Sequence, residues 1–146
     1  MNELRKIYQD FLDMPYYKRV ALGQDSVSEL KGYFEKVALK IGLKRDNSTI
    51  VLLGSLRQFI GADGVFGQDE YDYICDVFEL NFDYDAFLEM YNDLFGSYKM
   101  INNLRALMST SPEKVRFAYA RLGLLICCSD GELTVDEQKE FEKYLF

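Results

Sequence analysis

The sequence predicts an all-α protein: a single compact helical domain, 1–146, of about seven to eight helices. Apolar residues recur at helical spacing along most of the chain, and no stretch alternates convincingly between apolar and polar residues. A chain of 146 residues, 49% of them apolar, can bury one substantial core but is short for two domains. An internal repeat further predicts two pseudo-symmetric helix-loop-helix units, at about 50–80 and 117–146.

The N-terminal segment is expected to contain two helices before the first repeat unit. Residues 2–13 form an amphipathic pattern that Pro15 ends, because the residue before a proline is biased away from helical geometry. Residues 16–22 are expected to form a short helical turn closed by Gly23. The second long helix then starts at Ser26-Val27-Ser28-Glu29, which has capping-box spacing, and runs to Gly42.

The first repeat unit is predicted as a buried helix, a loop and an acidic helix. The cap-forming residues Asp46-Asn47-Ser48-Thr49 precede a largely apolar helix over 50–62. The acidic helix extends from about Gln68 to Leu80. We expect its inner face to consist of Tyr71, Ile74, Cys75 and Phe78.

The remaining helices are set by start and stop signals. Asp83 can cap a strongly periodic helix that stops at Gly96, and a less regular helix follows to residue 108. Ser111 as N-cap and Pro112 at the first helical position open an apolar, central helix that reaches residue 128. A last helix covers 134–146.

The repeat is carried by an Asp-Gly loop that appears twice. Asp63-Gly64 with Glu70 returns, 67 residues later, as Asp130-Gly131 with Glu137. In the structural interpretation, each glycine stops a helix and each glutamate caps the next one. Thr134-Val135-Asp136-Glu137 is a capping box, and Glu70 can reach back to a backbone N–H although Gly67 replaces the threonine.

The same residues allow a second interpretation, in which they bind a divalent cation. The chain has no histidine, so a metal site must use oxygen ligands, which favours Ca²⁺, Mg²⁺ or Mn²⁺. Each loop alone lacks carboxylates at the first positions of a Ca²⁺ loop, where it has Phe59 and Gly61 or Ile126 and Cys128. A site therefore requires that the two loops meet and pool four carboxylates: Asp63, Glu70, Asp130 and Glu137.

The acidic residues are concentrated in one stretch. Between Asp63 and Asp93 the chain has ten carboxylates and no Lys or Arg, and the formal net charge is -7. Such a surface repels nucleic acid and anionic lipid and favours cations or a basic protein partner. The outer face of the acidic helix, which we expect to bind the partner, consists of Asp69, Asp72, Asp76 and Glu79.

Three further features concern the cellular setting. The chain has three cysteines, Cys75, Cys127 and Cys128, an odd number that includes an adjacent pair, and this fits a reducing compartment. We expect Cys127 and Cys128 to pack in the core. The sequence has no signal-peptide pattern and no apolar run long enough to span a membrane. We therefore expect a cytoplasmic protein; its oligomeric state is left open.

The two loops and their flanking helices resemble the TerB-like family, which includes tellurite-resistance proteins and the N-terminal domain of DjlA-type co-chaperones. The resemblance covers residues 50–146 and rests on Ala62-Asp63-Gly64 with Glu70 and on Ser129-Asp130-Gly131 with Glu137. It implies an all-helical, non-enzymatic domain with acids that bind metal, acting in bacterial stress response or tellurite resistance complexes near the membrane. Gly67 departs from the acid or hydroxyl residue common in that family.

Two classes of function follow from these observations. The first is a non-enzymatic TerB-like module that uses its acidic loops for protein interaction or weak divalent cation binding. The alternative is a carboxylate-dependent, metal-assisted hydrolase with Glu70 or Glu137 as the base. A deep pocket lined by three or more of the acids would favour the hydrolase, whereas a flat acidic face would favour the binding module.

Overall fold

The computed structural model describes residues 2–56, 67–80, 83–86, 89, 93, 106–108, 110–129, 138–139 and 141–142. These residues form helices and no strand, which confirms the all-α prediction for this part of the chain. The loop of the second repeat unit and most of its last helix lie outside the described residues, so the repeat stays a prediction. The described helices are α1 (Asn2–Asp13), α2 (Tyr16–Lys40), the 3₁₀ helix η1 (Arg45–Asn47), α3 (Ser48–Ser55), α4 (Gln68–Phe78) and α7 (Glu113–Cys127).

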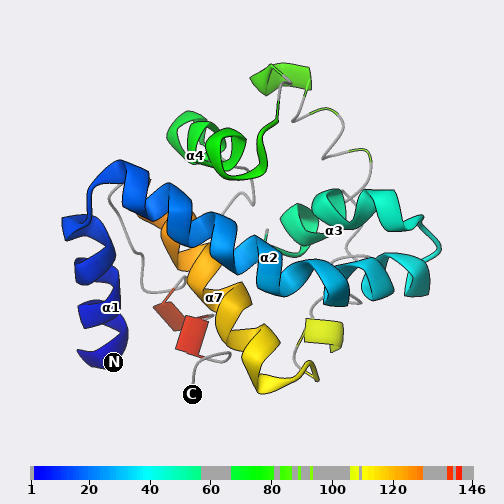
Figure 1. Ribbon diagram of the computed structural model, residues 1–146, viewed down its shortest axis with the longest axis horizontal. Helices are drawn as coiled ribbons and strands as arrows, with labels where there is room; N and C mark the ends of the chain where they lie inside the picture. The colour runs from blue at the N-terminus through cyan, green and yellow to red at the C-terminus, as the bar shows by residue number, and fades with distance from the viewer. Residues whose placement is uncertain are drawn as a thin grey trace.

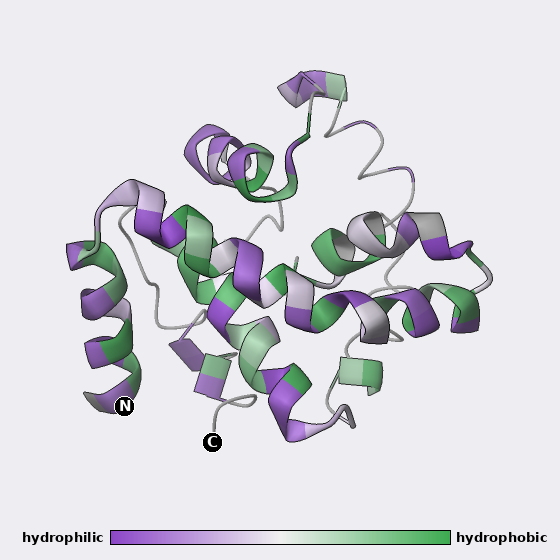
Figure 2. Ribbon diagram, in the orientation of Figure 1, coloured by the Kyte–Doolittle hydropathy of each residue, from purple (hydrophilic) through white to green (hydrophobic). Residues whose placement is uncertain are grey.

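Helix α2 is the element against which the others pack. It runs across the centre of the molecule, α7 crosses it, and α3 and α4 lie on its other side, while α1 packs against α7 (Figure 1). At the crossing of α2 and α7 the rings of Phe34 and Tyr119 stack with centroids 6.1 Å apart. The bands of hydrophilic and hydrophobic residues along α1 and α2 show the amphipathic pattern that the sequence predicts (Figure 2).

Helix α7 is the centre of the core, as its apolar sequence predicts. Every residue from Ala118 to Cys127 is buried except Arg121, which is half-buried. A helix that is apolar nearly all round must be covered on most sides. Here α1, α2 and α4 all contact it.

The prediction of a break at Gly23 is wrong. Residues 16–40 form one continuous helix, and Gly23 is a buried position within it. The hydroxyl of Ser26 donates a hydrogen bond to the Leu22 carbonyl oxygen, 3.0 Å away, instead of capping a new helix. The reason is tertiary, because the missing side chain at Gly23 makes room for Tyr73 and Val77 of α4.

The two ends of α2 follow the sequence signals. Helix α1 stops at Asp13 and Pro15 is the N-cap of α2, as expected from the proline. At the other end Gly42 has a φ of 86°, a left-handed conformation that glycine adopts without steric cost. The N–H of Leu43 donates to the Ala38 carbonyl at 2.8 Å and that of Gly42 to Leu39 at 3.2 Å, which is the Schellman pattern.

Two predicted helix starts are shifted. Helix α3 begins at Ser48, two residues before the expected start, directly after η1. Pro112 is the N-cap of α7 and not its first helical residue, so Ser111 is not the cap. The Ser111 hydroxyl instead donates to the Met108 carbonyl oxygen at 2.6 Å and closes the preceding helical turn.

Candidate acidic interaction face

Helix α4 is anchored by a buried side that differs in part from the prediction. Tyr71 and Ile74 are buried as expected, but Cys75 and Phe78 are only half-buried. Tyr73 and Val77 take their places in the core. The helix is thus rotated relative to the predicted face, towards the space left open at Gly23.

Tyr73 fixes α4 to the N-terminal half of α2. Its side chain is 1% exposed, and its hydroxyl donates a hydrogen bond to the Arg19 carbonyl oxygen at 2.7 Å. Its ring lies edge-on to that of Tyr16, with centroids 6.2 Å apart. The sequence pattern missed Tyr73; the signal that could have revealed it is Gly23, a small residue inside an otherwise continuous helical pattern.

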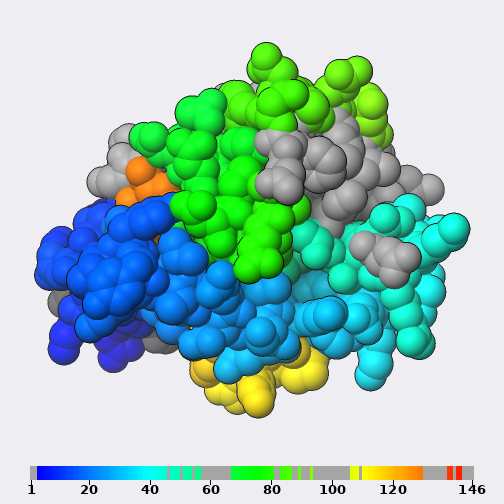
Figure 3. Space-filling model, turned by 45° about the horizontal axis from the view of Figure 1, so that its top comes forward, coloured from blue at the N-terminus to red at the C-terminus, as the bar shows by residue number. Residues whose placement is uncertain are grey.

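The four carboxylates predicted for partner binding are all exposed, on α4 and its C-cap. They follow the order i, i+3, i+7 and i+10, and therefore form one stripe about 15 Å long. We call this stripe the acidic face; it consists of Asp69, Asp72, Asp76 and Glu79. In the space-filling view α4 forms a raised surface beside the N-terminal part of α2 (Figure 3).

Local hydrogen bonds position two members of the acidic face. The side-chain amide of Gln68 donates to Asp72 at 2.9 Å, and the hydroxyl of Tyr16 donates to Asp76. No Lys or Arg occurs in α4, and none of the described cations forms an ion pair with the acidic face. Within the described part of the chain, the four carboxylates therefore have no ion-pair partner.

The Tyr16 hydroxyl lies beside the acidic face. Burial raises the pKa of the Tyr16 hydroxyl above its ordinary value, and its hydrogen bond to Asp76 raises the pKa further. The negative charges of Asp76 and Asp72 add to this increase, and Arg19 opposes it. The Arg19 guanidinium lies 5.6 Å from the centre of the Tyr16 ring, at the border between the acidic face and α2.

Left-handed geometry at Glu79 ends α4. Its φ of 57° and ψ of 46° make it a non-glycine residue in a conformation that costs a side-chain-bearing residue about 1 kcal/mol or more. Its N–H donates to the Cys75 carbonyl, as a helix C-cap does. A carboxylate thus occupies a position where glycine would be the most stable choice.

Of the four predicted metal ligands, only Glu70 lies within the described residues. This residue is 5% exposed, and its carboxylate accepts a hydrogen bond of 2.8 Å from the backbone N–H of Gly67, the capping contact that the sequence predicts. Asp63, Asp130 and Glu137 lie outside the described residues, so the structure does not say whether the two loops meet. Among the residues described, no group of three or more His, Cys, Asp or Glu side chains is arranged to hold a metal.

Two further predictions can be compared with the structure. Asp83 accepts a hydrogen bond of 2.8 Å from the backbone N–H of Ala86, so it caps the helix that follows, as expected. Cys127 and Cys128 are buried thiols of the core, also as expected.

The described part of the chain defines an all-helical protein with an acidic surface helix. None of its described helices has both the length and the apolar character that a membrane span needs. The chain matches no protein-family model, no curated protein and no solved structure.

Proposed function

We propose that this protein is a non-enzymatic, TerB-like helical module whose acidic face binds a basic segment of a protein partner. The observation that carries the proposal is the row of four exposed carboxylates on a helix with no basic residue. The opposite side of that helix is buried against the core, so the helix that carries the carboxylates is in place before any partner arrives. Such preorganisation reduces the entropy lost on binding.

The spacing of the carboxylates points to a helical partner. Lys or Arg residues spaced three and four apart on one side of an amphipathic helix recur at the same intervals as the carboxylates of the acidic face. Charges of opposite sign on two surfaces accelerate their association, and charges of the same sign weaken the binding of other proteins. The acidic face accordingly disfavours nucleic acid and anionic membranes.

Glu79 supports a functional role for the acidic face. Backbone strain persists where the surrounding structure compensates for it, and it often marks residues with a function. Glycine at this position would remove the strain, but it would also remove the last carboxylate of the stripe. The cellular setting that we propose, a cytoplasmic stress-response or tellurite-resistance complex, comes from the family resemblance.

The test uses a synthetic helical peptide with Lys or Arg along one side. We expect the wild-type protein to bind it, with an affinity that falls as salt is raised from 50 to 500 mM because exposed charges are screened. A variant with Asp69→Asn, Asp72→Asn, Asp76→Asn and Glu79→Gln should lose most of this binding. Isothermal titration calorimetry measures both effects.

A matched control separates the acidic face from net charge. Neutralising four other exposed carboxylates changes the total charge by the same amount but leaves the acidic face intact: Asp10→Asn, Asp13→Asn, Asp25→Asn and Glu113→Gln. The proposal requires the control to bind nearly as well as the wild type. Equal losses in both variants would show that the peptide senses only overall charge, and the proposal would be abandoned.

The cation-binding version and the hydrolase alternative have less support from the described residues. The carboxylate of Glu70 already accepts a backbone hydrogen bond, which is the structural role expected of a capping residue. Asp69, Asp72, Asp76 and Glu79 form an exposed row, whereas Glu70 is buried. Glu79 also lines a small cavity of about 200 Å³, and it is the one carboxylate among the described residues of that lining. This arrangement suits a binding module better than a metal-assisted hydrolase.

A further inference from the structure

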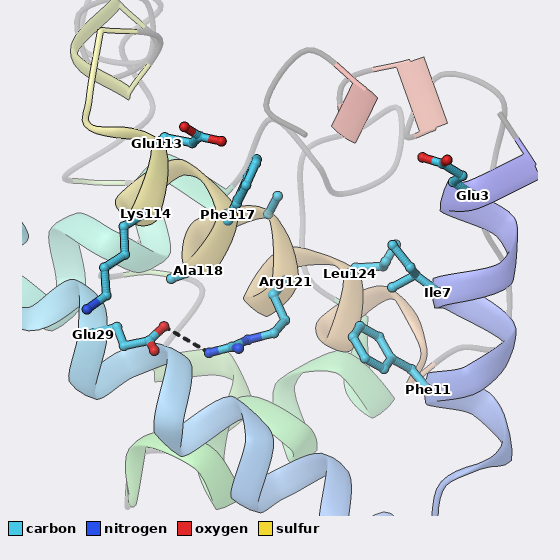
Figure 4. A pocket seen from close by; sticks show the side chains of 11 residues that line it. Glu3, Ile7, Phe11, Glu29, Glu113, Lys114, Phe117, Ala118, Arg121 and Leu124 are labelled. Atoms are coloured by element: carbon cyan, nitrogen blue, oxygen red, sulfur yellow. Dashed lines mark hydrogen bonds and ion pairs between the residues drawn. The ribbon is translucent and has the colours of Figure 1, made fainter. Parts of the chain in front are cut away.

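A cavity of about 690 Å³ opens between α1, α2 and α7 (Figure 4), and no residue of α4 lines it. Its volume lies within the range of small-molecule sites, about 300–1,000 Å³. Two neighbouring helices supply its apolar lining, Ile7 and Phe11 from α1 and Ala118 and Leu124 from α7. Phe117 also lines it and leaves 41% of its surface exposed, which is unfavourable for an aromatic ring in water.

The charged residues of the cavity are segregated. Lys114 and Arg121 extend to the α2 side, where Glu29 lies, and Glu3 and Glu113 are at the opposite edge (Figure 4). Lys114 and Arg121 are seven residues apart, about two helical turns, and therefore share one side of α7. The edge next to α2 thus holds two cations and one carboxylate, Glu29, which is paired with Arg121, and the interior is apolar.

Arg121 is held in a defined orientation with donors left over. Its Nε donates to the Ser26 hydroxyl at 2.7 Å and its Nη2 to Glu29 at 3.0 Å. A guanidinium has five N–H groups, so these two bonds fix the plane of the group and leave three N–H groups for another acceptor. The fork geometry of a guanidinium matches a carboxylate.

We propose that this cavity binds a fatty acid, a ligand beyond the basic partner proposed for the acidic face. The carboxylate of the ligand lies on Arg121 and Lys114, and its acyl chain lies over Ala118 and Leu124 towards α1. The remaining N–H groups of Arg121 are the donors that recognise an anionic head group. Glu3 and Glu113, at the far edge, repel that head group and so orient it towards α2.

The first experiment compares three ligands with the same chain length and different head groups. Decanoate, decylammonium and decanol are titrated into the full-length protein by isothermal titration calorimetry, the two ions below their micelle concentrations and decanol below its solubility limit. We expect saturable binding of decanoate at one site and weaker binding of the other two. Tighter binding of decylammonium or decanol, or no binding of any ligand, would overturn the proposal.

The second experiment uses variants whose effects have opposite signs. Arg121→Gln should weaken decanoate binding by about tenfold, because it removes a charge-assisted hydrogen bond. Glu29→Gln should strengthen binding by about two- to fivefold, since it removes the carboxylate that competes for the same guanidinium. Should Arg121→Gln fail to fold by circular dichroism, Lys114→Gln at an exposed position makes the same test.

The third experiment tests the apolar wall. Phe117→Ser should weaken decanoate binding, whereas Leu39→Ser, which removes an equally exposed apolar side chain outside the cavity, should not. If both variants bind decanoate like the wild type, the cavity is not the site. If the protein instead dimerises through Phe117 without binding decanoate, the cavity is an interface between two copies and the proposal is wrong.

Discussion

Replacing Gly23 by alanine tests how the packing of α4 on α2 is achieved. A Cβ atom at this position would lie 2.6 Å from the Tyr73 hydroxyl oxygen and 2.9 Å from a Val77 methyl carbon. Both distances are shorter than atoms tolerate, so α4 or these side chains must move. The Tyr73 ring is rigid, buried and held by its hydrogen bond to the Arg19 carbonyl, so its hydroxyl cannot move without losing that bond.

Two opposing effects set the size of the change. Alanine is favoured over glycine by about 1 kcal/mol inside a helix. Overpacking of a close contact costs about 1–3 kcal/mol, and the loss of a buried hydrogen bond costs a further 1–3 kcal/mol. We therefore expect Gly23→Ala to lower the free energy of unfolding by about 1–5 kcal/mol, despite its better helix propensity.

The assay is urea unfolding followed by circular dichroism, with Gly32→Ala as the matched control. Gly32 lies on the same helix and is exposed, and a Cβ there would meet no atom within 4 Å. It should therefore stabilise the protein by up to about 1 kcal/mol. In a Tyr73→Phe background, Gly23→Ala should cost less, because the nearest clashing atom is gone. Equal stabilisation by the two alanine substitutions would refute the packing argument.

Three further predictions concern α4, the tyrosines and the loops. Glu79→Gly should raise the free energy of unfolding by about 1 kcal/mol in the same assay, by relieving left-handed strain; a decrease would contradict this. Burial raises the pKa of Tyr73 and Tyr16 above the ordinary value of 10.0, so the unfolded chain releases their protons first and stability falls above about pH 10. Tyr73→Phe should flatten that decline, measured by unfolding at pH 9 to 11. If the Asp-Gly loops bind a cation, Ca²⁺, Mg²⁺ or Mn²⁺ should raise the melting temperature, and Asp63→Asn with Asp130→Asn should abolish the rise; no rise with any cation would exclude this site.

The candidate site was predictable where local contacts determine it. The capping contact between Glu70 and Gly67 and that between Asp83 and Ala86 join residues three apart, so the sequence pattern contains both partners. The exposure of the acidic face follows from the cost of burying four carboxylates without partners. The cavity between α1, α2 and α7 was not predictable, since α7 begins more than 70 residues after the end of α2 in the chain.

The sequence by itself determined the all-α class, the end of α1 before Pro15, the stop of α2 at Gly42 and the acidic, exposed outer face of α4. These features depend on spacing, on backbone stereochemistry and on contacts within one or two helical turns. Only the tertiary structure decided that α2 continues through Gly23 and that Tyr73 is buried. A glycine can end a helix or make room for a packed side chain, depending on what lies against it. At Gly23 the packed side chain is Tyr73, 50 residues away in the chain.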